Sequence, residues 1–325
     1  MLMIDGSYLE GGGQIVRASA ALSAVTGTPV EITRIRENRK KPGLGYQHCA
    51  AVRAVACACH GQLANNRPGS SSLSFIPGAV RNTECTVDVG TAGSIPLVIQ
   101  AWLPVALIKG GSLVVTGGTE VPLSPTVDYL EKVLFPALGT PAAGVSLRIL
   151  KRGYYPAGGG VVRVTVTPAD PEPVTIKQET ICGIRSCSSG LPSHVAEQQA
   201  SRAAVLLCEA LGEDIPVEIQ QYEGLSKGSS CTAWCGAKGS SSLGRPGLPA
   251  GKVGELTARG LIRELGQPGE VDSHMSDQLL IYLARYGGSY TASEYTFHAR
   301  TMCWLLSRFG FEIRVREGQV VGFSA

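Results

Sequence analysis

Residues 90–118, GTAGSIPLVIQAWLPVALIKGGSLVVTGG, decide the fold because the pattern they carry occurs three times along the chain. An apolar helical run ends at Gly110, where glycine can adopt the left-handed conformation that closes a helix, and the alternating strand SLVVTGG follows. A second helix, PTVDYLEKVLFPALG (125–139), and another strand, GVSLRILKRG (144–153), complete the pattern. We therefore predict a unit in which two helices pack on one face of a small sheet.

The same succession of elements is found once before and once after this unit. The earlier copy occupies residues 11–78, beginning GGGQIVRASAAL, and the later copy occupies residues 277–318, beginning DQLLIYLARYGG. A glycine follows each predicted helix: Gly27, Gly61, Gly110, Gly139, Gly287 and Gly310. Stacked units of this kind bury their apolar faces against one another, so the sequence predicts an α/β (α+β) fold made of three repeated units.

Residues 174–266 interrupt the series between the second and third copies. Their pattern is typical of a strand, a helix (HVAEQQASRAAVLLCEALG), a strand, a loop rich in Gly and Ser, and a helix (KVGELTARGLIREL). A segment of this length can fold as a small α/β domain of its own. We therefore predict a large domain made of residues 1–173, with the first two repeats, and 267–325, with the third, interrupted by an inserted domain at 174–266.

The composition is that of an ordinary globular protein, with 325 residues, 44% hydrophobic, 17% charged and a net charge of +3. This balance does not indicate a nucleic-acid-binding protein, so an anionic partner requires a local basic patch. The first residues lack the pattern of a signal peptide, and no run of about 18 apolar residues occurs, so we expect a cytoplasmic protein. The ten cysteines include no CxxC pair, and we expect them to be reduced and structural.

Three segments rich in glycine or basic residues could bind anions. LEGGGQIVR (9–17) brings bare backbone to a helix N-terminus, and Glu10 offers the oxygen ligand that Mg²⁺ or Mn²⁺ prefers; a simple tight turn is the alternative. RIRENRKKPGLGYQH (34–48) is the densest basic run and includes Tyr46 as a stacking face, although a solvated loop would look the same. RGYYPAGGGVV (152–162) has more glycines than a turn needs, which suggests that something approaches the backbone there; a flexible hairpin is the alternative.

One histidine lies at the start of a predicted helix, TFHARTMCWLL (296–306). His298 is one turn before Met302, which places it at the end of the buried stripe of this helix rather than in solvent. A histidine there most often packs or caps the helix. A helix N-terminus also disfavours the imidazolium, and a neutral imidazole can attack phosphorus where metal or arginine masks the phosphate charge. DSHMSDQLL (272–280) opens the first helix of the third copy, where its polar residues could bind a ligand or simply cap the helix.

Five segments, in order, resemble the RNA 3′-terminal phosphate cyclases: DGSYLEGGGQIVRASAALS, RKKPGLGYQH, RGYYPAGGG, DQL and HART. The resemblance covers nearly the whole chain. It implies three repeats of two helices on a four-stranded sheet, with a small α/β domain inserted before the third repeat. It also implies a ligase that uses ATP to convert an RNA 3′-terminal phosphate to a 2′,3′-cyclic phosphate. The implied route passes through a covalent histidine–AMP and an RNA-adenylate, and releases pyrophosphate and AMP.

The resemblance also implies roles for individual residues. His298 would be the nucleophile, and Glu10 would hold the divalent metal, Mg²⁺ or Mn²⁺. Many relatives have an aromatic residue where this chain has His274, and an imidazole can also stack on adenine. Nucleotide contacts are implied for Gln14, Arg17, Gln100, Pro125, His274, Met275, Ser276, Asp277 and Gln278, and contacts to RNA or its phosphates for Arg39, Lys41 and Gln47.

Two other functions fit parts of this pattern. One branch of the family acts in ribosome assembly as a catalytically inactive, cyclase-like RNA-binding factor without the catalytic histidine, so His298 argues against it. Enolpyruvyl transferases are built from a related unit, but they would need a different arrangement of lysines and acids. We expect RNA with a 3′-terminal phosphate as the partner, and neither a membrane nor an obligatory protein partner.

Overall fold

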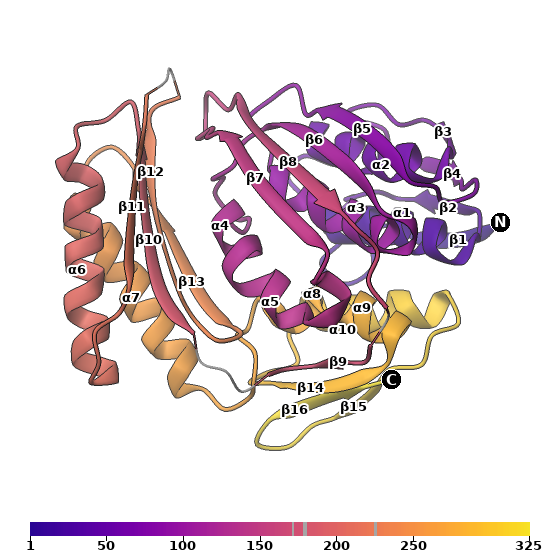
Figure 1. Ribbon diagram of the computed structural model, residues 1–325. Coiled ribbons are helices and arrows are strands. Elements are labelled where there is room, and N and C mark those ends of the chain that lie inside the picture. The colour runs from indigo at the N-terminus through magenta and orange to yellow at the C-terminus, as the bar shows by residue number, and fades with distance from the viewer. Residues whose placement is uncertain (171, 178–180, 224–225) are drawn as a thin grey trace.

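The computed structural model describes residues 1–170, 172–177, 181–223 and 226–325 (Figure 1). Within these ranges the chain forms a mixed α/β fold with four sheets of four strands each. The first sheet and its helices are β1 (Leu2–Asp5), α1 (Gly13–Thr26), β2 (Val30–Thr33), α2 (Tyr46–Cys59), β3 (Gln62–Ala64) and β4 (Leu73–Ile76). Its strand order is β1-β2-β4-β3, with β1 and β2 parallel and the other neighbours antiparallel.

The second sheet repeats this topology, with the order β5-β6-β8-β7 and the first pair parallel. A turn of π-helix, η1, continues α4 into α5. The elements are β5 (Thr83–Asp88), α3 (Ile95–Lys109), β6 (Gly111–Gly117), α4 (Val127–Tyr129), η1 (Leu130–Leu134), α5 (Phe135–Leu138), η2 (Thr140–Ala142), β7 (Val145–Lys151) and β8 (Gly160–Val166).

The third sheet takes one strand from residues 174–175 and three from the C-terminal part. Its elements are β9 (Val174–Thr175), α8 (Met275–Gln278), α9 (Leu280–Tyr286), β14 (Gly288–Ala292), α10 (Phe297–Arg308), β15 (Arg314–Arg316) and β16 (Val321–Ser324). The sequence pattern predicted that 174–175 belong to the insertion, but β9 pairs in parallel with β14 and completes the order β15-β16-β14-β9. The difference arises because the partner of so short an edge strand lies more than 100 residues away.

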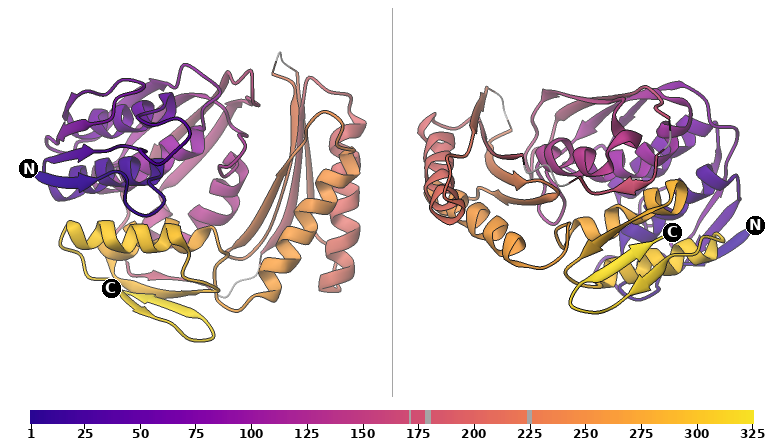
Figure 2. Two further views of the ribbon diagram at one scale, coloured as in Figure 1. Left: turned by 180° about the vertical axis from the view of Figure 1, so that it is seen from behind. Right: turned by 60° about the horizontal axis from the view of Figure 1, so that its bottom comes forward.

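The fourth sheet has the strand order β11-β10-β12-β13 and stands beside the other three (Figures 1 and 2). Its elements are β10 (Cys182–Ser189), α6 (His194–Leu211), β11 (Val217–Tyr222), β12 (Gly228–Cys235), β13 (Lys238–Leu243) and α7 (Ala250–Gly266). Both helices cover its outer face, and Cys231, Ala233 and Cys235 pack with them in a separate apolar cluster. The alternate residues of β12 point toward the second sheet, where Thr232 contacts Thr126.

The helices of the first three sheets meet in the centre of the molecule. Helices α1, α2 and α3 pack on one another, and α1 also packs on α10, so that a single large apolar cluster spans all three sheets. His60 rather than Gly61 closes α2, and Phe309 rather than Gly310 closes α10. In each case the predicted glycine is the next residue along the chain. Throughout the described ranges, each helix is too short or too polar to cross a lipid bilayer.

Four of the cysteines are paired, which differs from the expectation that all are reduced. Cys57 of α2 is bonded to Cys85 of β5, and Cys182 of β10 is bonded to Cys235, its direct neighbour on β12. These pairs are separated by 28 and 53 residues, so only the fold brings them together.

Candidate functional site

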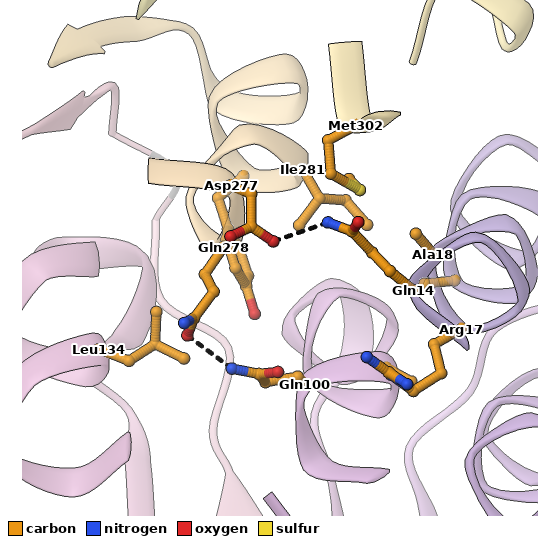
Figure 3. Close-up of a pocket in the computed structure, with 12 residues that line it drawn as sticks. Gln14, Arg17, Ala18, Gln100, Leu134, Asp277, Gln278, Ile281 and Met302 are labelled. Carbon is orange, nitrogen blue, oxygen red and sulfur yellow. Dashed lines mark hydrogen bonds between the residues drawn. The ribbon is translucent and has the colours of Figure 1, made fainter. Parts of the chain in front are cut away.

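A cavity of about 70 Å³ lies where α1, α3 and α8 meet. Helix α1 contributes Gln14 and Arg17, α3 contributes Gln100, and α8 contributes Asp277 and Gln278. Figure 3 shows these polar side chains around one space, with the guanidinium of Arg17 extending toward Gln100. The remaining lining residues are mainly apolar: Ala18, Ala21, Ala101, Leu134, Ile281, Tyr282 and Met302.

Two hydrogen-bonded pairs of side chains bridge this cavity, one between an amide and a carboxylate and one between two amides (Figure 3). Gln14 Nε2 donates to Asp277 Oδ2 at 2.7 Å, which joins α1 to α8. Gln100 Nε2 donates to Gln278 Oε1 at 2.6 Å, which joins α3 to α8, while Gln278 Nε2 donates to the carbonyl of His274 at 2.8 Å. Helices α1, α3 and α8 therefore each place at least one polar side chain in the same cavity.

His298 is next to the cavity, because α10 begins beside α1. Thr296 caps α10 by accepting a hydrogen bond from the Ala299 N–H at 3.0 Å, so His298 is the second residue of the helix. Its Nδ1 lies 3.1 Å from Gln14 Oε1, and its Nε2 lies 3.8 Å from Glu10 Oε2. The side chain of His298 is 54% exposed, so the expectation that it ends the buried stripe is wrong. At the second position of α10, the ring points toward α1 and solvent.

The hydrogen bonds of Gln14 determine the tautomer of His298. Because Gln14 Nε2 donates to Asp277, its Oε1 is the atom that faces His298 Nδ1, and an amide oxygen can only accept. Nδ1 therefore carries the proton when the ring is neutral, and Nε2 keeps its lone pair on the side facing Glu10. An exposed imidazole nitrogen with a free lone pair can act as a nucleophile.

Burial changes the pKa values of the two charged residues in the cavity. Burial raises the pKa of Asp277 to about 7, and the positive charge of Arg17 only partly opposes this shift. Burial also lowers the pKa of Arg17 to about 10, with Asp277 acting in the opposite direction. Among the described residues, no carboxylate forms an ion pair with Arg17, so its guanidinium is available to an anion.

The predicted phosphate-contacting residues lie in the loop before α2 and in its first turn, which contains Gln47. Arg39 forms an ion pair with Glu10 at 3.2 Å, which brings the loop to the glycines before α1. Gln47 Oε1 accepts a hydrogen bond from the Ser94 N–H at 3.1 Å and thereby faces α3, and Lys41 is exposed. Arg39 is therefore near His298 through Glu10, whereas Gln47 contacts the neighbouring loop.

Four other residues predicted to contact nucleotide do not line the cavity. Met275 and Ser276 are fully buried, and His274 is exposed at the start of α8. Pro125 is partly buried just before the Thr126 N-cap of α4. The segment 274–278 therefore contributes Asp277 and Gln278 by their side chains and His274 by its carbonyl.

The apolar wall of the cavity was not predicted from the sequence. Leu134, Ile281 and Met302 follow ordinary helical spacing, and nothing in that spacing distinguishes a cavity wall from a core. The stack of Tyr8 on Trp304, whose ring centroids are 4.0 Å apart, was not predicted either. This contact fixes the loop that carries Glu10 against α10, and two aromatic residues 296 positions apart give no local signal.

Comparison with known proteins identifies the family. The sequence profile of RNA 3′-terminal phosphate cyclase matches residues 8–315. The chain belongs to the RNA 3′-terminal phosphate cyclase family. Proteins named RNA 3′-terminal phosphate cyclase are 42% identical in Methanococcoides burtonii, over 95% of this chain and 94% of the relative, and 41% identical in Archaeoglobus fulgidus, over 99% of both. A further family member from Methanosarcina barkeri is 42% identical over 98% of both chains.

Proposed function

We propose that this protein is an ATP-dependent RNA 3′-terminal phosphate cyclase that uses His298 as its nucleophile. One observation carries the proposal: Gln14 accepts the Nδ1 proton of His298, so that the lone pair on Nε2 is exposed beside Glu10. The names of the relatives support the reaction class. A catalytically inactive RNA-binding factor would not need a histidine held in this tautomer.

The proposed reaction consists of three transfers at phosphorus. His298 Nε2 attacks the α-phosphorus of ATP, an N–P bond forms, and the bond to pyrophosphate breaks. An oxygen of the RNA 3′-phosphate then attacks the adenylate, which breaks the N–P bond, returns a neutral imidazole and leaves an RNA-adenylate. The adjacent 2′-hydroxyl attacks the RNA 3′-phosphorus, loses its proton and expels AMP. The adenylate is needed because a phosphate monoester lacks a good leaving group, and the last step is intramolecular.

The polar groups of the cavity are suited to a nucleotide. Gln14, Gln100 and Gln278 offer amide donors and acceptors, and Arg17 offers a cation that no carboxylate of the described residues pairs with. A cavity of about 70 Å³ is smaller than a purine nucleoside, so binding requires the bridging amides to exchange their hydrogen bonds for contacts with the ligand.

The residues are also suited to one divalent metal ion. The described residues contain no cluster of three His, Cys, Asp or Glu side chains for a metal. Mg²⁺ commonly binds through one carboxylate together with phosphate oxygens and water, and Glu10 is the carboxylate beside His298. When bound there, the ion would neutralise charge on the phosphates.

We also infer that the three sheets with the shared strand order are repeated units and that residues 182–266 form an inserted domain. The separate apolar cluster of the insertion supports this division. Under this interpretation, equivalent first helices of the three units provide Gln14, Gln100 and Asp277, so the repeats create the site.

The test is covalent labelling with ATP that carries a radioactive α-phosphate, in the presence of Mg²⁺. The wild-type protein should acquire label that is lost in acid and removed by hydroxylamine, and His298→Ala should acquire none. His60→Ala is a matched control, because His60 is an exposed histidine at the far end of α2. An unlabelled wild-type protein, or label retained in His298→Ala, would contradict the proposal.

A further inference from the structure

Asp272, which the proposed reaction does not use, is a buried carboxylate in the connection between α7 and α8. It is 0% exposed. A charged group that is removed from water is costly unless hydrogen-bond donors replace the water. Because this connection leads directly to the cavity residues Asp277 and Gln278, the donors that surround Asp272 affect the geometry of the cavity.

Four groups donate hydrogen bonds to the Asp272 carboxylate. The Tyr129 hydroxyl lies 2.9 Å from Oδ1 and 2.8 Å from Oδ2. The N–H of Gly239 donates to Oδ2 at 2.8 Å, and the N–H groups of His274 and Met275 donate to Oδ1 at 2.9 and 2.8 Å. Three of these donors are backbone amides, which cannot accept, so both oxygens of Asp272 are used as acceptors.

These donors belong to three separate parts of the fold. Tyr129 is on α4, Gly239 is on β13 of the fourth sheet, and His274 and Met275 are at the start of α8. A Cβ atom on Gly239 would lie 2.9 Å from Cε2 of Tyr129, so a glycine there lets β13 come close enough to α4 for its N–H to reach Asp272. Asp272 is therefore the point at which α4, the fourth sheet and α8 are joined.

The same connection is held to the C-terminal end of α7. Ser273, the residue after Asp272, donates to Glu264 from its N–H at 3.1 Å and from its hydroxyl at 2.8 Å. Lys238 of β13 donates to the carbonyls of Glu264 and Gln267 at 2.9 and 2.8 Å. Residues 272–273 are therefore fixed to both β13 and α7.

Helix α8 depends on such contacts because it is only four residues long. A single turn of helix has a costly nucleus and little stability in isolation. Its N-cap residue, His274, makes no side-chain capping bond, and the Asp272 carboxylate accepts from the amides at the start of the helix instead. The side chains of Asp277 and Gln278, which bond across the cavity to α1 and α3 (Figure 3), belong to this turn.

We propose that Asp272 is a positioning residue for the nucleotide cavity, which fixes α8 against α4 and the fourth sheet and thereby directs Asp277 and Gln278 toward the ligand. The inference rests on the proposed function for the identity of that ligand, ATP. Among the described residues, those that line the cavity lie outside the fourth sheet. The fourth sheet thus influences ATP binding through Asp272 rather than by lining the cavity.

The first experiment compares two matched variants in the absence of ATP. Tyr129→Phe removes the hydroxyl that contacts Asp272, whereas Tyr154→Phe removes an equally buried hydroxyl that lies 3.2 Å from Ser230 Oγ of the fourth sheet. Nuclear magnetic resonance of protein labelled with ¹⁵N-glutamine should show a shifted side-chain amide of Gln278 in Tyr129→Phe and the wild-type resonance in Tyr154→Phe. A loss of global stability alone leaves native resonances in place. The same shift in both variants, or in neither, would overturn the proposal.

The second experiment measures the ATP concentration that gives half the maximal rate of labelling. Tyr129→Phe should raise this concentration about tenfold, the value of one net hydrogen bond, and Tyr154→Phe should leave it unchanged. The maximal rate should stay within about twofold of the wild-type rate, because bound ATP itself orders the cavity, so the loss is in KM rather than in kcat. An unchanged concentration in Tyr129→Phe, or an equal rise in Tyr154→Phe, would refute the positioning role.

A third variant tests the contact with the fourth sheet. Asp272→Asn keeps an oxygen for the amides at the start of α8 and places an NH₂ group opposite the Gly239 N–H, so it breaks the contact with β13. It should raise the half-saturating ATP concentration as Tyr129→Phe does, and it provides the same comparison if Tyr129→Phe does not fold. A wild-type value in Asp272→Asn would exclude the fourth sheet from the positioning of α8.

The resonances of the free protein require neither ATP nor turnover, so this proposal and the cyclase proposal fail separately. If the wild-type protein acquires no label from ATP but Gln278 shifts in Tyr129→Phe alone, the fixing of α8 by Asp272 stands and the proposed reaction does not. If labelling succeeds while Gln278 does not shift, the reaction stands and the role of Asp272 is excluded.

Discussion

At the scale of single residues, Asp277 links the cavity to pH. Its native pKa of about 7 lies well above the ordinary value near 4, because burial disfavours the carboxylate. The folded protein therefore binds this proton more tightly than the unfolded chain does. The contribution of Asp277 to stability is fully present below pH 4 and is lost as the pH rises through 7.

Asp277→Asn should remove that dependence, because asparagine cannot ionise. The difference in unfolding free energy, variant minus wild type, should increase between pH 4 and 7 and then level off. Denaturant unfolding at a series of pH values measures it. Asp5→Asn is the control with the opposite sign, since the Ser7 side chain lowers the pKa of Asp5, so its difference should fall as the pH rises and do so at lower pH. Parallel curves for wild type and Asp277→Asn would contradict the assignment.

Two histidines show how neighbouring groups select different nitrogens. The Gln14 oxygen places the proton of His298 on Nδ1, whereas the Gly45 N–H places that of His48 on Nε2. The position of His298 at a helix start and the family pattern predicted that it is the nucleophile. The tautomer of His48 was not predictable, since it depends on a local backbone turn that brings the Gly45 N–H to the ring.

At the scale of elements, the start of α10 determines where His298 points. The Thr296 side chain caps this helix by accepting a hydrogen bond from the Ala299 N–H. Thr296→Ala should lower the unfolding free energy by about 1 kcal/mol, the usual value of an N-cap hydroxyl, and should also slow adenylylation of His298. Thr296→Ser keeps the hydroxyl and should behave as the wild type does. Chemical denaturation and the rate of labelling test both effects, and equal stability of the Ala and Ser variants would refute them.

The elements that local signals define were predictable from the sequence. The helix closed at Gly27 and the alternating strand 111–117 follow from glycine conformation and side-chain alternation. Pairings between distant segments were not predictable. The two-residue strand β9 pairs with β14, more than 100 residues away, and Cys57 of α2 is bonded to Cys85 of β5. Neither Pro125 nor His274 lines the cavity, because their placement depends on how α4 and α8 pack rather than on their own sequence.

At the scale of the whole molecule, a buried network of charges joins the second sheet and α4 to the fourth sheet. Arg152 forms two hydrogen bonds to Asp128, at 2.7 and 2.8 Å, and an ion pair with Glu120. Arg185 of β10 contacts the same Asp128 at 2.8 Å and Glu218 of β11 at 2.7 Å. The shared carboxylate of Asp128 therefore connects arginines from both sides. The inner face of the fourth sheet is held by charge pairs, whereas its outer face is held by apolar packing against α6 and α7.

Removing the central cation should destabilise the protein strongly. Arg152→Met leaves Glu120 and Asp128 buried without their main counter-ion, so we expect a loss of about 3–5 kcal/mol in unfolding free energy. Burial already raises the pKa of Glu120 to about 7, and loss of the arginine raises it further. The folded variant then binds a proton more tightly than the wild type, so its loss of unfolding free energy should be smaller at pH 5 than at pH 8.

Lys252→Met, which removes the basic partner of an exposed pair on α7, should leave stability near that of the wild type at both pH values. Denaturant unfolding of both variants tests the network, and a small, pH-independent loss in Arg152→Met would show that the insertion is held by packing instead.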